Sequence, residues 1–233
     1  IIGDNAGNVN TASYNTMIGF QAGISNTSGT ALTFLGSQAG NLNTTGVANT
    51  GIGFNTLGAT TTGSGNTAVG GYWSGVALGA LHQNTTGGFN SALGVGALGG
   101  NTTGLYNTAV GFQAGYSNST GNAVTAMGYQ AAYAATNQVT AFGYRALASN
   151  TSATDNAGFG VNALVSTTTG NYNSGFGNGA LQNNILGGQN TAVGWCASFS
   201  NGSAYYNAAV GYQALLNNTA NSNTAVGFQA MYS

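Results

Sequence analysis

Apolar and polar residues alternate along this chain in short blocks that recur at a fixed distance. The block Asn-Thr-Ala-Val-Gly-aromatic-Gln-Ala, or a close variant, occurs 14 times, and nine of the 13 intervals between its central glycines span seventeen positions. The central glycines are Gly3, Gly19, Gly36, Gly53, Gly70, Gly94, Gly111, Gly128, Gly143, Gly160, Gly177, Gly194, Gly211 and Gly227. A fixed short period predicts a solenoid, in which each repeat forms one coil that stacks on the coil before it.

A second glycine, in the sequence Asn-Thr-Thr-Gly or a variant of it, follows many central glycines at a constant distance, as Gly46 follows Gly36 and Gly104 follows Gly94. Each repeat therefore contains two turns, with the glycines allowing positive φ or close backbone approach. The segments between the turns are short and rich in β-branched and aromatic residues, which favours strands over helices. We predict an all-β fold: one parallel β-solenoid, or β-roll, of about 14 coils over residues 1–233.

Residues at the same position of successive repeats form ranks. The residue before the central glycine is always apolar, as in Ile52, Val69 and Val110, and this rank is the predicted core. Thr or Ser stands two residues earlier, and Asn one residue before that. Strand alternation places Thr, Val and the aromatic residue on one face and Asn, Ala, Gly and Gln on the other. The small residues of the second face predict close approach by another backbone, and hence side-by-side association of copies.

The composition of the chain excludes several classes of function. The chain contains 41 Gly and no Pro, and its only charged side chains are Asp4, Arg145 and Asp155. Nucleic-acid binding requires a basic surface, and most catalytic or metal sites require converging acids, bases or ligands. Without these groups we expect no enzyme activity, no cofactor, no metal and no nucleic-acid partner, and without a long apolar run no membrane insertion. Charges repeated in a rank would also repel their own copies on adjacent strands.

The repeat resembles two known families. Asn66–Gly70, Asn107–Gly111, Asn190–Gly194 and Asn223–Gly227 are similar to the Asn-Ser-x-Ala-Ile-Gly repeats of trimeric autotransporter adhesin heads. With Asn-Thr-Thr-Gly added, the repeat also resembles those of phage and bacterial tail-fibre-like proteins. The resemblance implies a non-enzymatic structural or adhesive segment on a cell surface or virion fibre, outside the cell. It further implies self-association as a homotrimer or filament, and a host-surface or glycan receptor as partner. Because the first and last residues both fall inside a repeat, we also expect the sequence to be an excerpt of a longer chain.

Two other functions remain open at this point. One is a self-polymerising extracellular fibril, glycosylated in a host that modifies Asn-x-Ser/Thr. The other is an ice-binding or carbohydrate-binding solenoid, in which the regular Thr rank faces outward. The candidate N-glycosylation residues are Asn26, Asn43, Asn84, Asn101, Asn118, Asn150, Asn201 and Asn217. The alternative interpretation of these sequons is turn chemistry, because Asn, Thr and Gly are common in turns.

One interval is irregular. The distance from Gly70 to Gly94 exceeds the usual period by seven positions, and the surplus lies at about 71–79. Tyr72, Trp73 and the nearby His82 form a candidate contact loop there; the alternative is a short, degenerate coil centred on Gly79. His82 by itself is expected to be a turn residue rather than a metal ligand. We likewise expect Cys196 to be a substituted repeat position rather than a reactive thiol.

Overall fold

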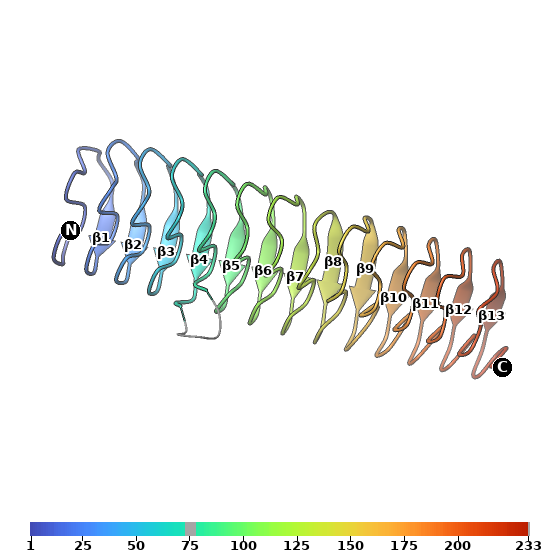
Figure 1. The fold of residues 1–233 in the computed structure, drawn as a ribbon. Coiled ribbons are helices and arrows are strands. Elements are labelled where there is room, and N and C mark those ends of the chain that lie inside the picture. Colours follow the sequence, from blue (N-terminus) through green and yellow to red (C-terminus); the bar gives the residue numbers. More distant parts are fainter. Residues whose placement is uncertain (73–77, 233) are drawn as a thin grey trace. The chain divides into compact units, whose positions relative to one another are not determined.

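A computed structural model describes residues 1–72 and 78–232 of the chain. The chain divides into two compact units, Ile1–Ala123 and Val124–Ser233. In each unit every repeat except the first of the chain contributes one short strand to a single parallel sheet, and the rest of the repeat returns the chain to the start of the next strand (Figure 1). Each unit is therefore a parallel β-solenoid built on the seventeen-residue repeat, as the periodicity predicts.

All of the strands are three or four residues long. In the first unit they are β1 (Thr16–Ile18), β2 (Thr33–Leu35), β3 (Thr50–Ile52), β4 (Thr67–Val69), β5 (Ser91–Leu93) and β6 (Thr108–Val110). In the second they are β7 (Thr125–Met127), β8 (Val139–Phe142), β9 (Asn156–Phe159), β10 (Ser174–Phe176), β11 (Thr191–Val193), β12 (Ala208–Val210) and β13 (Thr224–Val226).

The strands pair in the register that the repeat dictates. Thr33 lies opposite Thr50, and Ser174 lies opposite Thr191, so residues of one rank are cross-strand neighbours. The 13 strands of the described residues bound about 12 turns of the solenoid, fewer than the 14 predicted. One of the two missing coils is the N-terminal repeat, where Ile2 forms only an isolated bridge to Ile18 and no strand. The other arises because 13 strands enclose only 12 intervals.

The predicted core was wrong. The rank before the central glycine points outward: Leu93 is 51 % exposed and Val193 is 40 % exposed. The buried residue is the central one of each strand, for example Ala92 or Ala192. The alternation was predicted correctly but the inner face was not. The small-residue face is covered by the returning segment of the same coil, and a second copy is not needed to cover it.

Leucine from the returning segment supplies much of the core. Four residues after the central glycine, a buried Leu adopts a left-handed backbone conformation, with φ near +50° at Leu57 and Leu98. The other members of this rank include Leu81, Leu147, Leu164, Leu181 and Leu215. Left-handed backbone costs a non-glycine residue about 1–2 kcal/mol, whereas burying a Leu side chain contributes about 1.5–3 kcal/mol. Burial therefore outweighs the strain.

Side-chain size is balanced across each coil. Where the strand centre is large, as at Phe34, the leucine position carries Gly40 instead, and a Cβ at Gly40 would overlap the Phe34 ring. Where the strand centre is Gly175, the neighbouring space is occupied by Leu164. The narrow interior thus holds about one large side chain per coil, drawn from either wall, which agrees with the close packing of protein interiors.

Two ladders of buried asparagine line the end of the coil next to the Thr-Thr-Gly turn. In the first ladder, the rank four before the central glycine, the side-chain oxygen accepts the next Asn backbone N–H; Asn190 N donates to Asn173 Oδ1 at 3.0 Å. In the second ladder the sequon asparagines bond to one another, with Asn43 Nδ2 2.9 Å from Asn26 Oδ1. Amides of both ladders also donate to carbonyls of the turn: Asn49 Nδ2 lies 2.7 Å from Gly63 O, and Asn43 Nδ2 lies 3.1 Å from Gly46 O. Most of the buried amides therefore have hydrogen-bond partners, as is usual for buried polar groups.

Both ladders are interrupted together where the turn is short. The interval from Gly128 to Gly143 is two positions shorter than the usual period. The ladder positions there are Ala135 and Val139, both buried. With no Thr-Thr-Gly carbonyl to accept from them, buried amides would be unsatisfied, so apolar residues are the favourable choice at this coil.

This interruption yields a stability prediction. Asn184 donates to Gly187 O at 2.9 Å and accepts from Asn201 Nδ2 at 2.8 Å, whereas neither amide atom of Asn150 has a partner among the described residues. Asn184→Ala is expected to lower the free energy of unfolding by about 2 kcal/mol, and Asn150→Ala to leave it unchanged or higher. The two substitutions remove the same atoms, so chemical denaturation of both variants isolates the hydrogen-bond contribution. Equal losses would show that the ladder bonds contribute nothing.

The surplus residues of the long interval do not form a coil of their own. β4 pairs directly with β5, Val69 lying opposite Leu93. Ala80 N donates to Gly70 O at 2.9 Å, a bond that joins residues three apart in regular coils, as from Ala22 to Gly19. No coil therefore lies between those of β4 and β5, which excludes a degenerate coil centred on Gly79. Trp73 lies outside the described residues.

Candidate binding surface on the sheet

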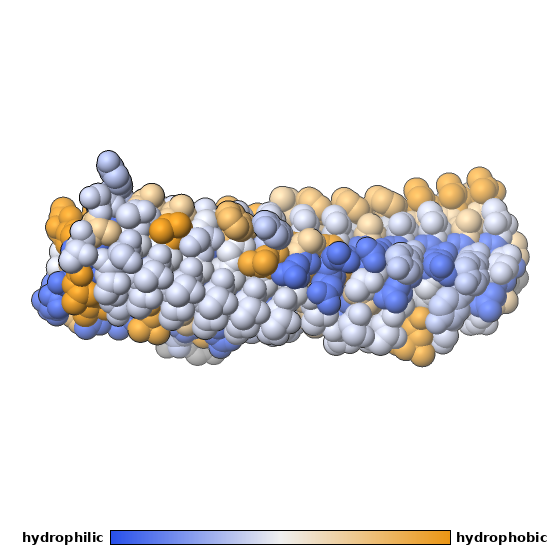
Figure 2. Space-filling model, turned by 90° about the horizontal axis from the view of Figure 1, so that it is seen from above, coloured by the Kyte–Doolittle hydropathy of each residue, from blue (hydrophilic) through white to orange (hydrophobic). Residues whose placement is uncertain are grey.

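We call the outer face of the sheet the sheet face. Three ranks compose it, at the positions three before, one before and one after the central glycine: a hydroxyl rank, in which Ala157 and Ala208 replace Thr or Ser, an apolar rank, and a mostly aromatic rank. Alternation forces this arrangement, because the buried strand-centre residue and the central glycine stand between the three outward positions. In the part holding β8–β13, apolar side chains recur at regular intervals along one edge (Figure 2).

The apolar rank is continuous within each unit. In the first unit it consists of Ile18, Leu35, Ile52, Val69, Leu93 and Val110. In the second it consists of Met127, Phe142, Phe159, Phe176, Val193, Val210 and Val226. None of these side chains belongs to the buried core. Scattered exposed apolar residues are normal on proteins, but a contiguous apolar stripe marks an interaction surface.

Aromatic side chains on this face stack on one another. Phe159 lies between Phe142 and Phe176, with ring-centroid distances of 5.1 and 4.9 Å and nearly parallel planes. Trp195 and Tyr212 of the aromatic rank stack in the same way at 4.9 Å. Because each ring covers the face of the next, these ranks present ring edges outward. They suit apolar packing better than the stacking of a flat sugar ring on an exposed aromatic face.

Threonine occurs in two ranks with different hydrogen bonding. In the turn rank, each hydroxyl donates to the backbone of the next coil; Thr44 Oγ1 lies 3.0 Å from Thr61 O, and Thr102 Oγ1 lies 2.9 Å from Ser119 O. In the hydroxyl rank of the sheet face no such bond forms among the described residues, as at Thr33 and Thr50. The hydroxyl rank is therefore free to bond outward. Its members in the first unit are Thr16, Thr33, Thr50, Thr67, Ser91 and Thr108.

The central glycines form the corner where the sheet face ends. At most of them φ lies between +125° and +141°, and a Cβ would meet the backbone of the neighbouring glycine. At Gly160, for example, the added Cβ would lie 2.5 Å from Gly177 O. These residues, predicted as turn glycines, are required both by backbone conformation and by contact between coils.

The fold leaves no room for glycans at most of the candidate sequons. Seven of them, from Asn26 to Asn201 along the chain, are fully buried in the second asparagine ladder. A sugar on any of these side chains is incompatible with the folded coil, because each of them is enclosed by protein atoms. At six of the seven, all except Asn150, the amide nitrogen that would carry the sugar donates to a turn carbonyl. Asn217 is the exposed member of the set. Turn chemistry accounts for the sequon pattern.

The other residues considered in the sequence analysis, His82, Tyr72 and Cys196, do not form a common site. His82 is partly buried in a turn, with Nδ1 3.2 Å from Asn55 O, and Tyr72 makes an edge contact with Phe54. Burial raises the pKa of the Cys196 thiol, which keeps it protonated and weakly nucleophilic at neutral pH. Among the described residues there is no cluster of three potential metal ligands, and no helix long and apolar enough to cross a membrane.

The chain matches no protein-family model, no curated protein and no solved structure. Functional inference therefore depends on the chain's own geometry and on the repeat resemblance described above.

Proposed function

We propose that this chain is a segment of an extracellular structural and adhesive fibre, in which copies of the chain associate side by side through the sheet face. The observation that carries the proposal is the continuous, solvent-exposed apolar rank in each unit. Burial of apolar surface is the main favourable contribution to protein association. The apolar rank contains no charged residue to oppose it, and on the sheet face as a whole Asp4 stands in the aromatic rank of the first repeat.

The period of the sheet face indicates what covers it. Its ranks repeat at the strand spacing of about 4.8 Å. A partner can make the same contacts with every coil only if its own structure repeats at the same spacing. A second copy of this chain has that repeat. Aligned side by side, apolar rank packs against apolar rank over the whole length of a unit, as in obligate interfaces, which resemble a protein core.

The resemblance to adhesin heads and tail fibres supplies the number of copies and the location. Three copies around an axis would bury the three sheet faces against one another and leave the turns outside. In this arrangement the segment acts as a shaft or head on a cell surface or virion fibre. The receptor, a host-surface protein or a glycan, would then contact the turns rather than the sheet.

Sedimentation equilibrium at micromolar concentration tests the assembly. The expected mass is that of three copies of the 22.9 kDa chain. A different small number of copies would support association through the face and correct the stoichiometry. A monodisperse monomer at the highest soluble concentration would overturn the proposal.

The free hydroxyls favour ice binding as a second candidate function. An unbroken rank of hydroxyls beside a rank of methyl-bearing side chains, at regular spacing on a sheet, can order water at its surface. The arrangement predicted for this function, with Thr facing outward, is present in the first unit. The two functions compete, because the assembled fibre would cover the same hydroxyls.

Measurement of thermal hysteresis distinguishes ice binding from fibre assembly. If ice is the ligand, the chain should show thermal hysteresis, and Thr50→Tyr should abolish it because a bulky ring breaks the rank. Thr102→Tyr is the matched control, since Thr102 is partly exposed in the turn rank and its hydroxyl is bonded within the protein. Absence of hysteresis in the unmodified chain would exclude this function.

A further inference from the structure

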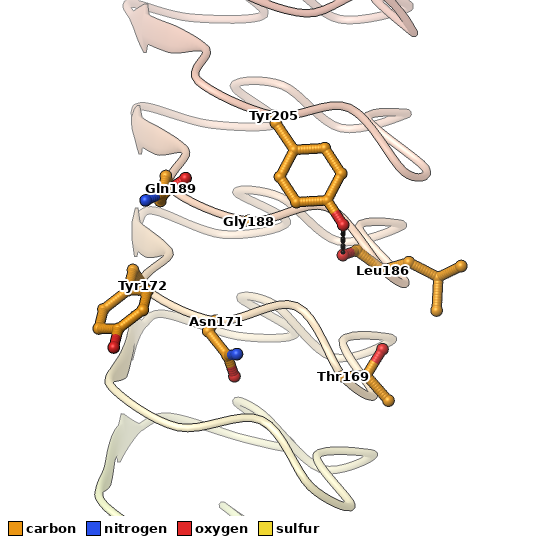
Figure 3. A pocket seen from close by; sticks show the side chains of 7 residues that line it. All are labelled: Thr169, Asn171, Tyr172, Leu186, Gly188, Gln189 and Tyr205. Carbon is orange, nitrogen blue, oxygen red and sulfur yellow. Dashed lines mark hydrogen bonds between the residues drawn. The ribbon is translucent and has the colours of Figure 1, made fainter.

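A notch in the second unit breaks the regularity of the solenoid. Six residues before the central glycine, successive coils carry Asn171, Gly188 and Tyr205. Because Gly188 has no side chain, a pocket of about 200 Å³ opens between its two neighbours in the rank. Thr169, Tyr172 and Gln189 complete most of its lining (Figure 3).

An aromatic ring is held in place over this pocket. Tyr205 Oη donates to Leu186 O at 3.0 Å, and a Cβ at Gly188 would lie 3.2 Å from the ring. Figure 3 shows the ring leaning across the coil of Gly188 toward Leu186. Tyr205 is nevertheless 39 % exposed. Unlike the rings of the sheet face, it has no parallel ring stacked against it among the described residues.

Several polar side chains of the pocket lining have no protein partner, or only one. Asn171 Oδ1 accepts from Thr154 N at 2.8 Å, which leaves its amide N–H groups available. The side chains of Thr169 and Gln189 form no hydrogen bond among the described residues, and the Tyr172 hydroxyl is likewise unbonded. The pocket therefore offers two carboxamides and two hydroxyls as both donors and acceptors.

We propose that this notch binds a neutral saccharide. One sugar face presents C–H groups that pack on an aromatic ring, while hydroxyls at its edge exchange hydrogen bonds with carboxamides and hydroxyls. The pocket has no cation to pair with an acidic sugar. Asp155 stands one coil before Tyr172 in the same rank, so the nearest charge is negative. Neutral ligands are thus favoured over anionic ones.

The site is independent of the surface used for assembly. Its residues precede β10, β11 and β12 and belong to none of the three ranks of the sheet face. A saccharide bound there would contact a fibre from outside. The inference goes beyond the proposed fibre function by giving the adhesive surface a place and a ligand class.

The test is saturation-transfer NMR on the full chain with maltotriose, cellotriose and tri-N-acetylchitotriose at millimolar concentration, and 3′-sialyllactose as the acidic counterpart. At least one neutral oligosaccharide is expected to receive saturation, and the acidic one is not. Tyr205→Ser should reduce the affinity tenfold or more. Tyr206→Ser is the matched control, because Tyr206 is the next residue, is 60 % exposed and does not line the pocket.

A second variant fills the notch with a side chain that the same rank carries elsewhere. Asn171, one coil before Gly188, and Asn221, two coils after it, each accept a backbone N–H from the preceding coil. Because a Cβ at Gly188 would lie 3.0 Å from Asn171 O, far-UV circular dichroism checks the fold of the variant. Gly188→Asn restores that pattern and should abolish binding while the chain stays folded. No transfer from any neutral oligosaccharide, or equal transfer in Gly188→Asn, overturns the proposal. Sedimentation of the same samples reports on assembly separately, so failure of one proposal is distinguishable from failure of the other.

Discussion

Val193→Lys is expected to convert the assembled chain into folded monomers. Val193 is the outward residue at the end of β11 and lies in the apolar rank, so the ammonium group would be buried between copies without a partner. Burying an unpaired charge costs several kcal/mol. A loss of about 3 kcal/mol lowers an association constant more than a hundredfold. Sedimentation equilibrium measures the change in mass.

A matched variant separates loss of assembly from a general effect of charge. Ser152→Lys adds the same ammonium group to an exposed turn residue, away from the sheet face, and should leave the assembly intact. Far-UV circular dichroism should be unchanged in both variants, since neither side chain enters the core. If Val193→Lys assembled as well as Ser152→Lys, the apolar rank would not be the interface.

Gly160→Ala should have the largest effect on stability, lowering the free energy of unfolding by about 3–5 kcal/mol. Gly160 has φ +137°, a conformation nearly restricted to glycine that costs another residue about 1–3 kcal/mol. The new Cβ would also meet Gly177 O and C at 2.5 and 2.6 Å. Forcing the coils apart adds about 1–3 kcal/mol of overpacking.

Gly202→Ala is the control for backbone strain alone. Gly202 has φ +61°, and a Cβ there would meet no atom within 4 Å. Its expected cost is about 1–2 kcal/mol, that of placing alanine in the left-handed region. Thermal or chemical denaturation of the two variants measures the difference. Equal losses would show that contact between central glycines does not limit the coil spacing.

Much of the fold could be predicted because the sequence repeats at a fixed period. Identical residues one period apart are placed in register by parallel stacking, so the pairing of Thr33 with Thr50 could be predicted from the sequence. The same argument places the Asn residues four before the central glycines in one rank. It could not predict the second ladder, because Asn-Thr-Thr-Gly is equally compatible with an exposed turn, and only the closed coil shows Asn84 and Asn101 buried together.

The candidate surfaces were less accessible to sequence reasoning. Outward orientation of the hydroxyl rank was predicted only as a condition for ice binding, and the difference between its free hydroxyls and the bonded turn rank depends on the path of the returning segment. The notch had a weak signal, since Gly188 stands between Asn171 and Tyr205 in its rank, and a glycine in this rank also occurs at Gly88. The position of the Tyr205 ring over Gly188 is a tertiary contact that no repeat pattern contains.

By itself the sequence determined the period, the presence of β-strands, their register and which residues share a face. The period and the register depend on the spacing between repeats, and the shared faces depend on alternation within one strand. The tertiary structure alone decided which face is inside. Both faces are uncharged, so hydropathy favoured the larger residues Leu93 and Val193 as core. The coil closes over alanine instead, because the returning Leu98 and Leu181 fit only against small side chains, and this leaves the larger apolar rank exposed for a partner.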